Sequence, residues 1–244
     1  MALLVVNGIS KTFGGLQAVK DLHFTLEAGE ILGIIGPNGA GKTTAFNMIA
    51  GFFAPDSGTI HFKGEDITGQ RPWNISHRKI ARTFQLSKPF GDLSVLENVM
   101  VGGFHHQGSR AAARQKALEV LAYTGMEIQT HVEAHNLTAT DRKRLELARC
   151  LATDPELLLL DEVVAGATPT EASAMMDLIR KIRDSGVTVI MVEHVMRVVM
   201  GLSHRVLVLH HGETIAMGKP DVVSQDPTVL KAYLGERHAQ PATR

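Results

Sequence analysis

The sequence predicts an α/β fold in which a strand-rich core is interrupted by a helical insertion. Two apolar runs, Leu157 to Leu160 and Val187 to Val192, are typical of parallel strands that are buried on both faces. A glycine-rich loop at 36–44 follows an apolar strand at 31–35 and precedes an expected helix. From 93 to 151 the apolar residues change to a helical period.

Shorter elements are predicted from the local alternation of apolar and polar residues and from residues typical of turns. The stretch Leu3 to Val6 and the alternating segment Ala18 to Leu26 predict strands of a sheet that is partly antiparallel. A helix is expected at 170–183, with Thr170 as its cap. The remaining elements are strands at 59–62, 206–209 and 214–217, turns at 63–65 and 211–213, and helices from Lys42, at 111–123 and at 228–234.

These elements are interpreted as one domain over 1–244. Its expected parts are a core at 1–86 and 153–235, a helical subdomain at 87–152, and a polar tail at 236–244.

Composition excludes several classes of protein. The formal net charge is +0, so the chain lacks the basic surface expected of a nucleic-acid-binding protein. Cys150 is the only cysteine, which excludes an intramolecular disulfide and agrees with a reducing compartment. We expect no signal peptide in the first residues, and no apolar run approaches the roughly twenty residues of a membrane span. If the protein acts at a membrane, we expect another chain to supply the membrane-spanning segments.

The glycine-rich loop matches the phosphate-binding pattern G-x-x-x-x-G-K-[ST] in full. Glycines let successive N–H groups point at phosphate oxygens, and the following helix presents its N-terminus to the same anion. Lys42 is expected to reach the β- and γ-phosphates, and the Thr43 hydroxyl to hold Mg²⁺. The candidate residues are Gly36, Pro37, Asn38, Gly39, Ala40, Gly41, Lys42, Thr43 and Thr44.

Two adjacent carboxylates follow the strand Leu157 to Leu160, at the end where open α/β sheets bind ligands. Asp161 fits a carboxylate that holds Mg²⁺ through water, and Glu162 fits a general base that polarises the attacking water. A helix start or a solvated turn is the alternative for such a pair, but it is disfavoured beside a complete phosphate-binding loop.

Two further polar residues stand at strand ends. His194 follows the run 187–192, where it could sense the γ-phosphate or position the water, although such a histidine is often structural. Gln85 follows the segment 80–84, at the junction between the core and the helical insertion. It could be an ordinary polar residue at a strand end, or it could touch Mg²⁺ and move with the insertion, which would make it a coupling element.

Taken together, these residues resemble the ABC transporter ATPase family, and the resemblance covers almost the whole chain. Phe13 stands where that family places an aromatic ring that stacks on adenine. The phosphate-binding loop, Gln85, Asp161-Glu162 and His194 occur in the family order. The stretches that resemble the branched-chain amino acid importer subfamily are 80–85, 93–99, 145–149 and 193–196.

The resemblance implies a P-loop NTPase (RecA-like) core with an antiparallel β-subdomain and an inserted α-helical subdomain. It implies ATP and Mg²⁺ as ligands, and ATP hydrolysis that powers import of branched-chain or related hydrophobic amino acids. The implied partners are transmembrane permease subunits, a second ATPase subunit bound head to tail as a homo- or heterodimer, and indirectly a periplasmic or extracellular solute-binding protein. The implied location is peripheral, on the cytoplasmic face of the inner membrane.

The chain departs from the family at the signature, usually Leu-Ser-Gly-Gly-Gln, which family members place against ATP on the opposite subunit. Residues 137–141 here read Leu-Thr-Ala-Thr-Asp, so Thr138 keeps a hydroxyl while both glycines are lost. Asp141 either adds a negative charge near an anion or caps a helix beginning at Arg142. The basic run 142–144 is either compensating charge or a solvated helix face.

A second departure follows Glu162. The family more often has proline at Val163, and Leu-Asn or Leu-Asp at Ala167-Thr168, in a segment that crosses the dimer interface. Two alternatives therefore stay open beside the importer ATPase. One is a catalytically weak nucleotide-binding partner in a heterodimeric transporter. The other is a non-transport ABC ATPase, which the short chain and neutral charge disfavour.

Overall fold

A computed structural model describes residues 2–85, 88–105 and 108–234. The chain divides into two compact units. The first unit draws on 1–72 and 188–244, and the second on 73–187. The expected division into a core and a helical subdomain at 87–152 stays a prediction, and the expected polar tail at 236–244 lies outside the described residues.

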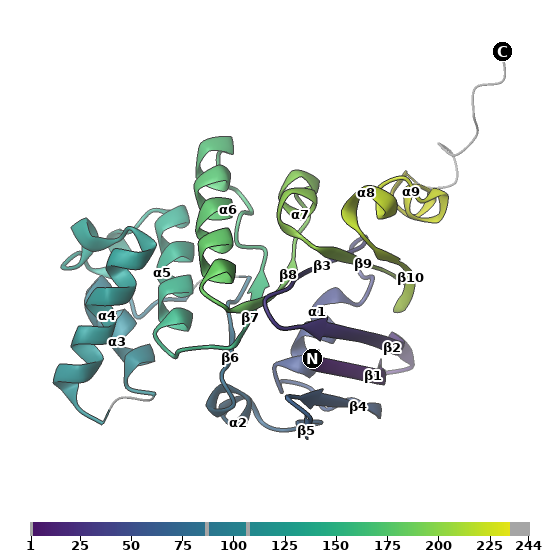
Figure 1. Cartoon of the computed structure of the whole chain (residues 1–244), viewed down its shortest axis with the longest axis horizontal. Coiled ribbons are helices and arrows are strands. Elements are labelled where there is room, and N and C mark those ends of the chain that lie inside the picture. The colour runs from purple at the N-terminus through teal and green to yellow at the C-terminus, as the bar shows by residue number, and fades with distance from the viewer. Residues whose placement is uncertain (1, 86–87, 106–107, 235–244) are drawn as a thin grey trace, which may run out of the picture. The chain divides into compact units, whose positions relative to one another are not determined.

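An antiparallel sheet in the first unit begins the chain (Figure 1). Its strand order is β2-β1-β4-β5, which confirms the antiparallel pairing expected for the N-terminal strands. One face of β1 and β2 is buried through alternate residues, as a half-buried pleated strand requires. The bounds are β1 Ala2–Phe13, β2 Leu16–Glu27, β4 Ser57–Phe62 and β5 Glu65–Asp66.

A second set of strands in the first unit pairs in the order β10-β9-β3-β8. β3 pairs in parallel with β8 and β9, and every residue of β3 and β8 is buried, as predicted from their apolar runs. The bounds are β3 Ile31–Ile35, β8 Thr188–Val192, β9 Arg205–His210 and β10 Glu213–Gly218. The helices of this unit are α1 Lys42–Ile49, α7 Met196–Leu202, α8 Pro220–Val223 and α9 Pro227–Leu234.

The second unit holds the parallel pair β6 and β7 and a group of helices. In α4 the buried residues recur at helical spacing, and α3, α4 and α5 pack against one another (Figure 1). The bounds are α2 Pro72–His77, β6 Ile80–Arg82, α3 Val95–Gly103, α4 Arg110–Thr124, α5 Ala139–Leu151, β7 Leu157–Asp161 and α6 Pro169–Asp184. Two short 3₁₀ turns, Glu127–Gln129 and Ala134–Asn136, lie between α4 and α5.

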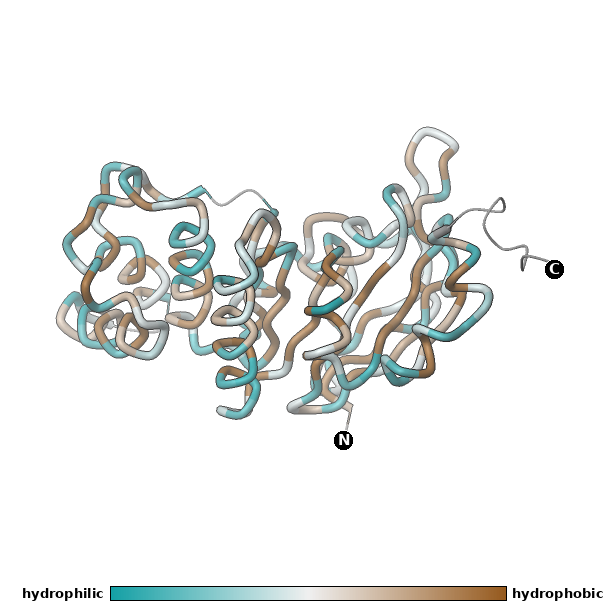
Figure 2. The backbone as a smooth tube through the Cα atoms, turned by 90° about the horizontal axis from the view of Figure 1, so that it is seen from above, coloured by the Kyte–Doolittle hydropathy of each residue, from teal (hydrophilic) through white to brown (hydrophobic). Residues whose placement is uncertain are grey.

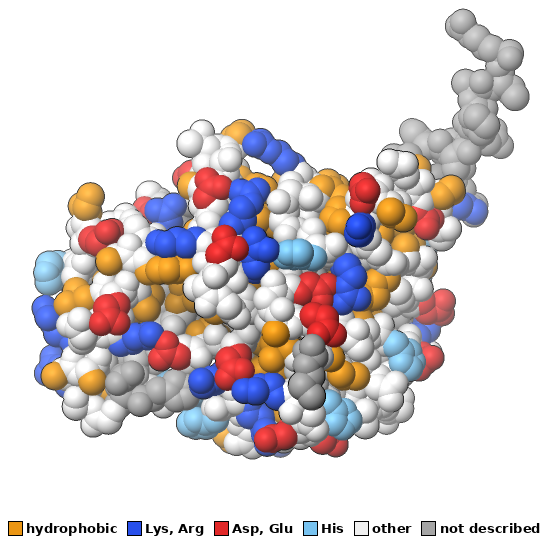
Figure 3. All heavy atoms as spheres, viewed as in Figure 1, with side chains coloured by type: hydrophobic (Ala, Val, Ile, Leu, Met, Phe, Trp, Pro, Cys, Tyr) orange, Lys and Arg blue, Asp and Glu red, His pale blue; other side chains and the backbone are white. Residues whose placement is uncertain are grey.

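The hydropathy of the residues differs between the strands and the loops that connect them. The extended segments of the backbone are largely hydrophobic and many connecting loops are hydrophilic (Figure 2). Basic and acidic side chains are interspersed over the face seen in Figure 3. Among the described residues, no helix has both the length and the apolar character needed to cross a bilayer.

The predicted cap of α6 is wrong. Thr168, not Thr170, caps the helix, because Pro169 occupies the first helical position and its fixed φ starts the helix there. Thr168 accepts the N–H of Glu171, and the Glu171 carboxylate accepts the N–H of Thr168 in return. This reciprocal capping box satisfies two N–H groups that a start at Thr170 would leave without partners.

An ion pair between Glu30 and Arg205 within the first unit predicts a pH dependence of stability. Arg205 Nη2 donates to Glu30 Oε2 at 2.9 Å, and the Glu30 side chain is 10% exposed. Burial raises the pKa of Glu30, but the hydrogen bond from Arg205, the N–H of Glu27 and the Arg205 charge together lower it below its usual 4.5.

Because the folded pKa lies below the unfolded one, the pair stabilises the fold fully above pH 4.5 and progressively less as the pH falls through the folded pKa. We expect Glu30→Gln to lower the free energy of unfolding by about 1–2 kcal/mol at pH 7. Urea unfolding of both proteins between pH 7 and 3 should show this difference shrinking below pH 4.5. A difference that stays constant over the whole range would contradict the assignment.

Candidate nucleotide-binding site

The phosphate-binding loop lies between β3 and α1 in the first unit. Lys42 is 6% exposed, and its Nζ donates to the carbonyl oxygens of Gly36 at 2.8 Å and Pro37 at 2.9 Å. The ammonium is thereby held inside the curl of the loop. Gly41 has φ 103°, and a Cβ there would stand 2.3 Å from the carbonyl oxygen of Ala18, so only glycine fits this close approach to β2.

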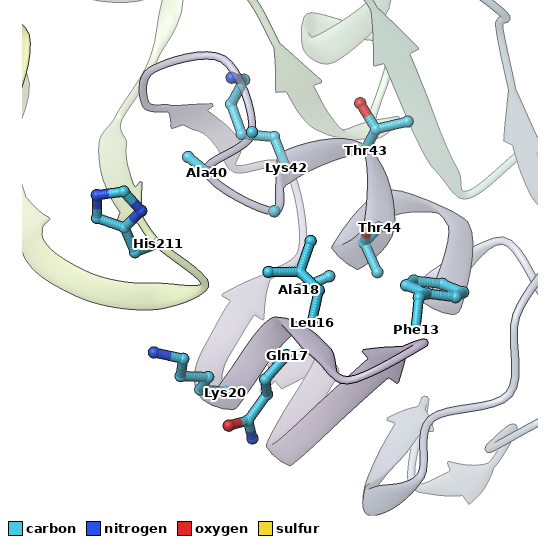
Figure 4. Close-up of a pocket in the computed structure, with 12 residues that line it drawn as sticks. Phe13, Leu16, Gln17, Ala18, Lys20, Ala40, Lys42, Thr43, Thr44 and His211 are labelled. Carbon is cyan, nitrogen blue, oxygen red and sulfur yellow. The ribbon is translucent and has the colours of Figure 1, made fainter.

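A pocket of about 680 Å³ opens at this loop, within the size range of small-molecule sites. In Figure 4, Lys42, Thr43 and Thr44 belong to the start of α1, and Phe13 stands at the end of β1. Phe13 is 40% exposed, with its ring edge-on to Phe53 at a centroid distance of 5.2 Å. The pocket is lined by Phe13, Leu16, Gln17, Ala18, Lys20, Gly39, Ala40, Gly41, Lys42, Thr43, Thr44 and His211.

The pocket suits a nucleotide on chemical grounds. Residue 41, the N-cap of α1, is a glycine without a capping side chain, so the first N–H groups of the helix can serve an anion. An ammonium and two hydroxyls stand beside these N–H groups, and an exposed aromatic ring stands at the pocket wall. The arrangement therefore offers phosphate donors together with a surface on which a base could stack.

The carboxylates at the end of β7 belong to the second unit. Arg82 Nη2 donates to Asp161 Oδ2 at 3.1 Å, and these side chains are 9% and 4% exposed. Burial lowers the pKa of Arg82, while the charges of Asp161 and Glu146 oppose that effect. Gln85 Nε2 donates to Glu162 Oε2 at 3.1 Å. The structure thus brings Gln85 beside Glu162, directly after the end of β7 at Asp161.

The oxygen donors expected for Mg²⁺ are chemically suitable. The Thr43 hydroxyl, the Gln85 amide oxygen and the Asp161 carboxylate are hard oxygen ligands of the kind that Mg²⁺ binds. Thr43 is in the first unit, and the other two residues are in the second.

The altered signature forms the start of α5, and the expected helix start at Arg142 is wrong. Thr138 is the N-cap and accepts the N–H of Asp141 at 3.1 Å, so the helix begins three residues earlier. Its hydroxyl also donates to Asp141 Oδ2 at 2.8 Å. Asp141 therefore lies in the first turn, where its charge is favourable to the helix dipole, and it is not the cap.

His194 follows β8 and the buried Glu193, and its side chain is exposed. It is not among the described residues that line the pocket. Its expected role at the γ-phosphate therefore stays a prediction.

Several residues near these sites were missed from the sequence. Arg82 could have been found. It is the last residue of β6 and follows two apolar residues, and the parallel pairing of β6 with β7 places it near the acidic end of β7. Tyr233 of α9 has no local signal, yet its phenol accepts the N–H of Gly36 in the loop. Burial raises the pKa of Tyr233, and this hydrogen bond partly opposes the rise.

Comparison with known families agrees with this geometry. A model of the ABC transporter family matches residues 19–165, and the chain belongs to that family, with a P-loop NTPase fold and an antiparallel β-subdomain. Residues 213–239 match a second model, described as branched-chain amino acid ATP-binding cassette transporter.

Among curated relatives, the chain is 37% identical to the high-affinity branched-chain amino acid transport ATP-binding protein LivG of Escherichia coli K12, over 96% of this chain and 98% of the relative. It is 36% identical to the corresponding protein BraF of Pseudomonas aeruginosa, with the same coverage of 96% and 98%.

Solved structures give the same result for the fold. A nucleotide-free ATP-binding cassette from an ABC transporter superposes with a TM-score of 0.89 at 29% identity, covering 97% of this chain and all of that one. The ADP conformation of MJ1267, another such cassette, gives 0.88 at 30% identity, with coverage of 97% and 100%. A dimeric post-hydrolysis state of MJ0796 with ADP and Pi gives 0.80 at 26% identity, covering 89% of this chain and 98% of that one.

Proposed function

We propose that this chain binds and hydrolyses ATP to power an importer of branched-chain or related hydrophobic amino acids. The observation that carries the proposal is the pocket at the phosphate-binding loop, where the Lys42 ammonium, the N-terminus of α1 and Phe13 meet. The similarity to LivG and BraF over nearly the whole chain supports the solute class.

In this mechanism the phosphates of ATP occupy the loop, with Lys42 on the β- and γ-phosphates and Phe13 stacked on the base. Thr43, Gln85 and Asp161 would hold Mg²⁺, which neutralises charge on the phosphates when bound. Glu162 accepts a proton from the attacking water, Gln85 holds the Glu162 carboxylate, and His194 contacts the γ-phosphate.

Two subunits would close head to tail, so that each loop faces Thr138 and the start of α5 of the other subunit. ATP favours the closed pair, and hydrolysis removes the γ-phosphate contacts that hold it. Permease subunits in the membrane would receive this motion near Gln85, with a solute-binding protein on their far side. The chain would lie on the cytoplasmic face of the membrane as a peripheral subunit.

One observation favours a second candidate, a catalytically weak partner in a heterodimeric transporter. The Thr138 hydroxyl is engaged with Asp141 of its own helix, and Asp141 adds negative charge to the helix turn that would face the phosphates. In this case the site completed by residues 137–141 is the weaker of two.

Steady-state ATP hydrolysis by the purified chain separates these candidates. We expect the rate per subunit to rise with protein concentration, because only the pair forms complete sites, and then to reach a plateau. Nucleotide binding without turnover at any concentration would favour the weak-partner candidate. Failure to bind ATP would contradict both.

A further inference from the structure

Lys143 of α5 contacts the backbone that carries Glu162. Its Nζ donates to the carbonyl oxygen of Glu162 at 2.8 Å and to that of Ala165 at 2.7 Å. Residues 142–144 are half-buried. The ammonium of Lys143 lies against the loop that leaves β7.

That loop has an unusual backbone. Glu162 has φ 51°, a left-handed conformation that costs roughly 1–2 kcal/mol for residues other than glycine. The N–H of Ala165 donates to the Glu162 carbonyl at 3.2 Å, which closes a turn over 162–165. The two carbonyl oxygens held by Lys143 are those at the two ends of this turn.

Two side chains of the same unit donate hydrogen bonds to Glu162. Gln85 holds the side chain, at 3.1 Å from Oε2, and Lys143 holds the backbone. Hydrogen bonds from an ammonium are roughly twice as strong as those between neutral groups. A strained conformation persists where its surroundings over-determine it, and the ammonium is one such constraint.

We propose that Lys143 is a positioning residue, which fixes the turn 162–165 so that the Glu162 carboxylate is aimed at the attacking water. This inference rests on the proposed role of Glu162 as general base. The helix that carries Lys143 also connects the signature residues with the turn that carries Glu162. Thr138, the cap of α5, is five residues from Lys143, about 7.5 Å along the helix, so one helix carries both the signature and the residue that contacts the turn.

The test uses Lys143→Met and Lys143→Arg, with Lys181→Met as the matched control. Lys181 is in the same unit and also donates its ammonium to a backbone carbonyl, that of Tyr123 at 3.0 Å, but it is on α6 and, among the described residues, it donates no hydrogen bond to the turn. Hydrogen exchange of amides 162–168 measures directly whether Lys143 stabilises the turn, and kcat and KM for ATP measure the effect on ATP hydrolysis.

In Lys143→Met we expect amides of the turn to exchange on the order of tenfold faster, and kcat to fall about 10–100-fold, because small misplacements of a catalytic group have effects of this size. The KM and the affinity for ATP should stay within about threefold, since the pocket is formed by residues of the other unit. Lys143→Arg should recover most of the rate, because a guanidinium can donate to both carbonyls.

Unchanged exchange in Lys143→Met, or an equal loss of kcat in Lys181→Met, would overturn the inference. Failure of the proposed function is seen separately, in Glu162→Gln assayed alongside. If Glu162→Gln hydrolyses ATP normally, Glu162 is not the base and Lys143 cannot act through it, whereas the exchange data still decide whether Lys143 holds the turn.

Discussion

Glu162→Gln should lower kcat for ATP hydrolysis by about 10²–10⁴-fold, the usual contribution of a general base. Glutamine keeps the size of the side chain and can still meet Gln85, but it cannot accept a proton from water. The affinity for ATP should be retained, because Glu162 is not among the described residues that line the nucleotide pocket. Steady-state hydrolysis and equilibrium binding of ATP to the purified variant measure the two quantities.

A matched control for this variant is Glu119→Gln, which removes the charge of an exposed glutamate on α4 of the same unit. The Glu119 carboxylate accepts a hydrogen bond from Gln115 at 2.9 Å, one turn away on the same helix. We expect its turnover to equal that of the wild type. Turnover of Glu162→Gln at the wild-type rate would show that Glu162 is not the general base.

Lys42→Ala should weaken ATP binding on the order of a hundredfold or more. The Lys42 ammonium is buried within the loop, where each hydrogen bond to a charged group contributes about 1.5–3 kcal/mol, and each 1.4 kcal/mol is tenfold in affinity. Fluorescent-nucleotide titration or calorimetry would measure the change, with circular dichroism and the Tm as checks on folding.

Lys20→Ala is the informative comparison, because Lys20 also lines the pocket but pairs with Glu213 at 3.0 Å. It should reduce affinity much less, since its charge is already matched by a carboxylate at the surface. Equal losses in the two variants would mean that the pocket attracts ATP by general charge, and not through the position of Lys42 in the loop.

Much of the fold and part of the candidate site could be predicted from local patterns. The buried strands at 31–35, 157–161 and 188–192 follow from uninterrupted apolar runs, and the loop between β3 and α1 follows from glycines at fixed spacing. Helix starts were less predictable. Thr138 and Thr168 each cap a helix whose predicted start lies two or more residues later, because several serine, threonine or aspartate residues compete for the cap and backbone geometry selects one.

The P-loop, the acidic end of β7 and the α/β order could all be predicted from the residues alone, since each depends on residues that are adjacent in the chain. The folded chain was needed to show that Arg82 pairs with Asp161, 79 residues away, and that Lys143 donates to Glu162, 19 residues away. Lysine and arginine side chains are long and flexible, so the pattern of residues around them does not specify a partner. Their contacts are selected when packing of α5 and pairing of β6 with β7 bring one carboxylate or carbonyl within reach.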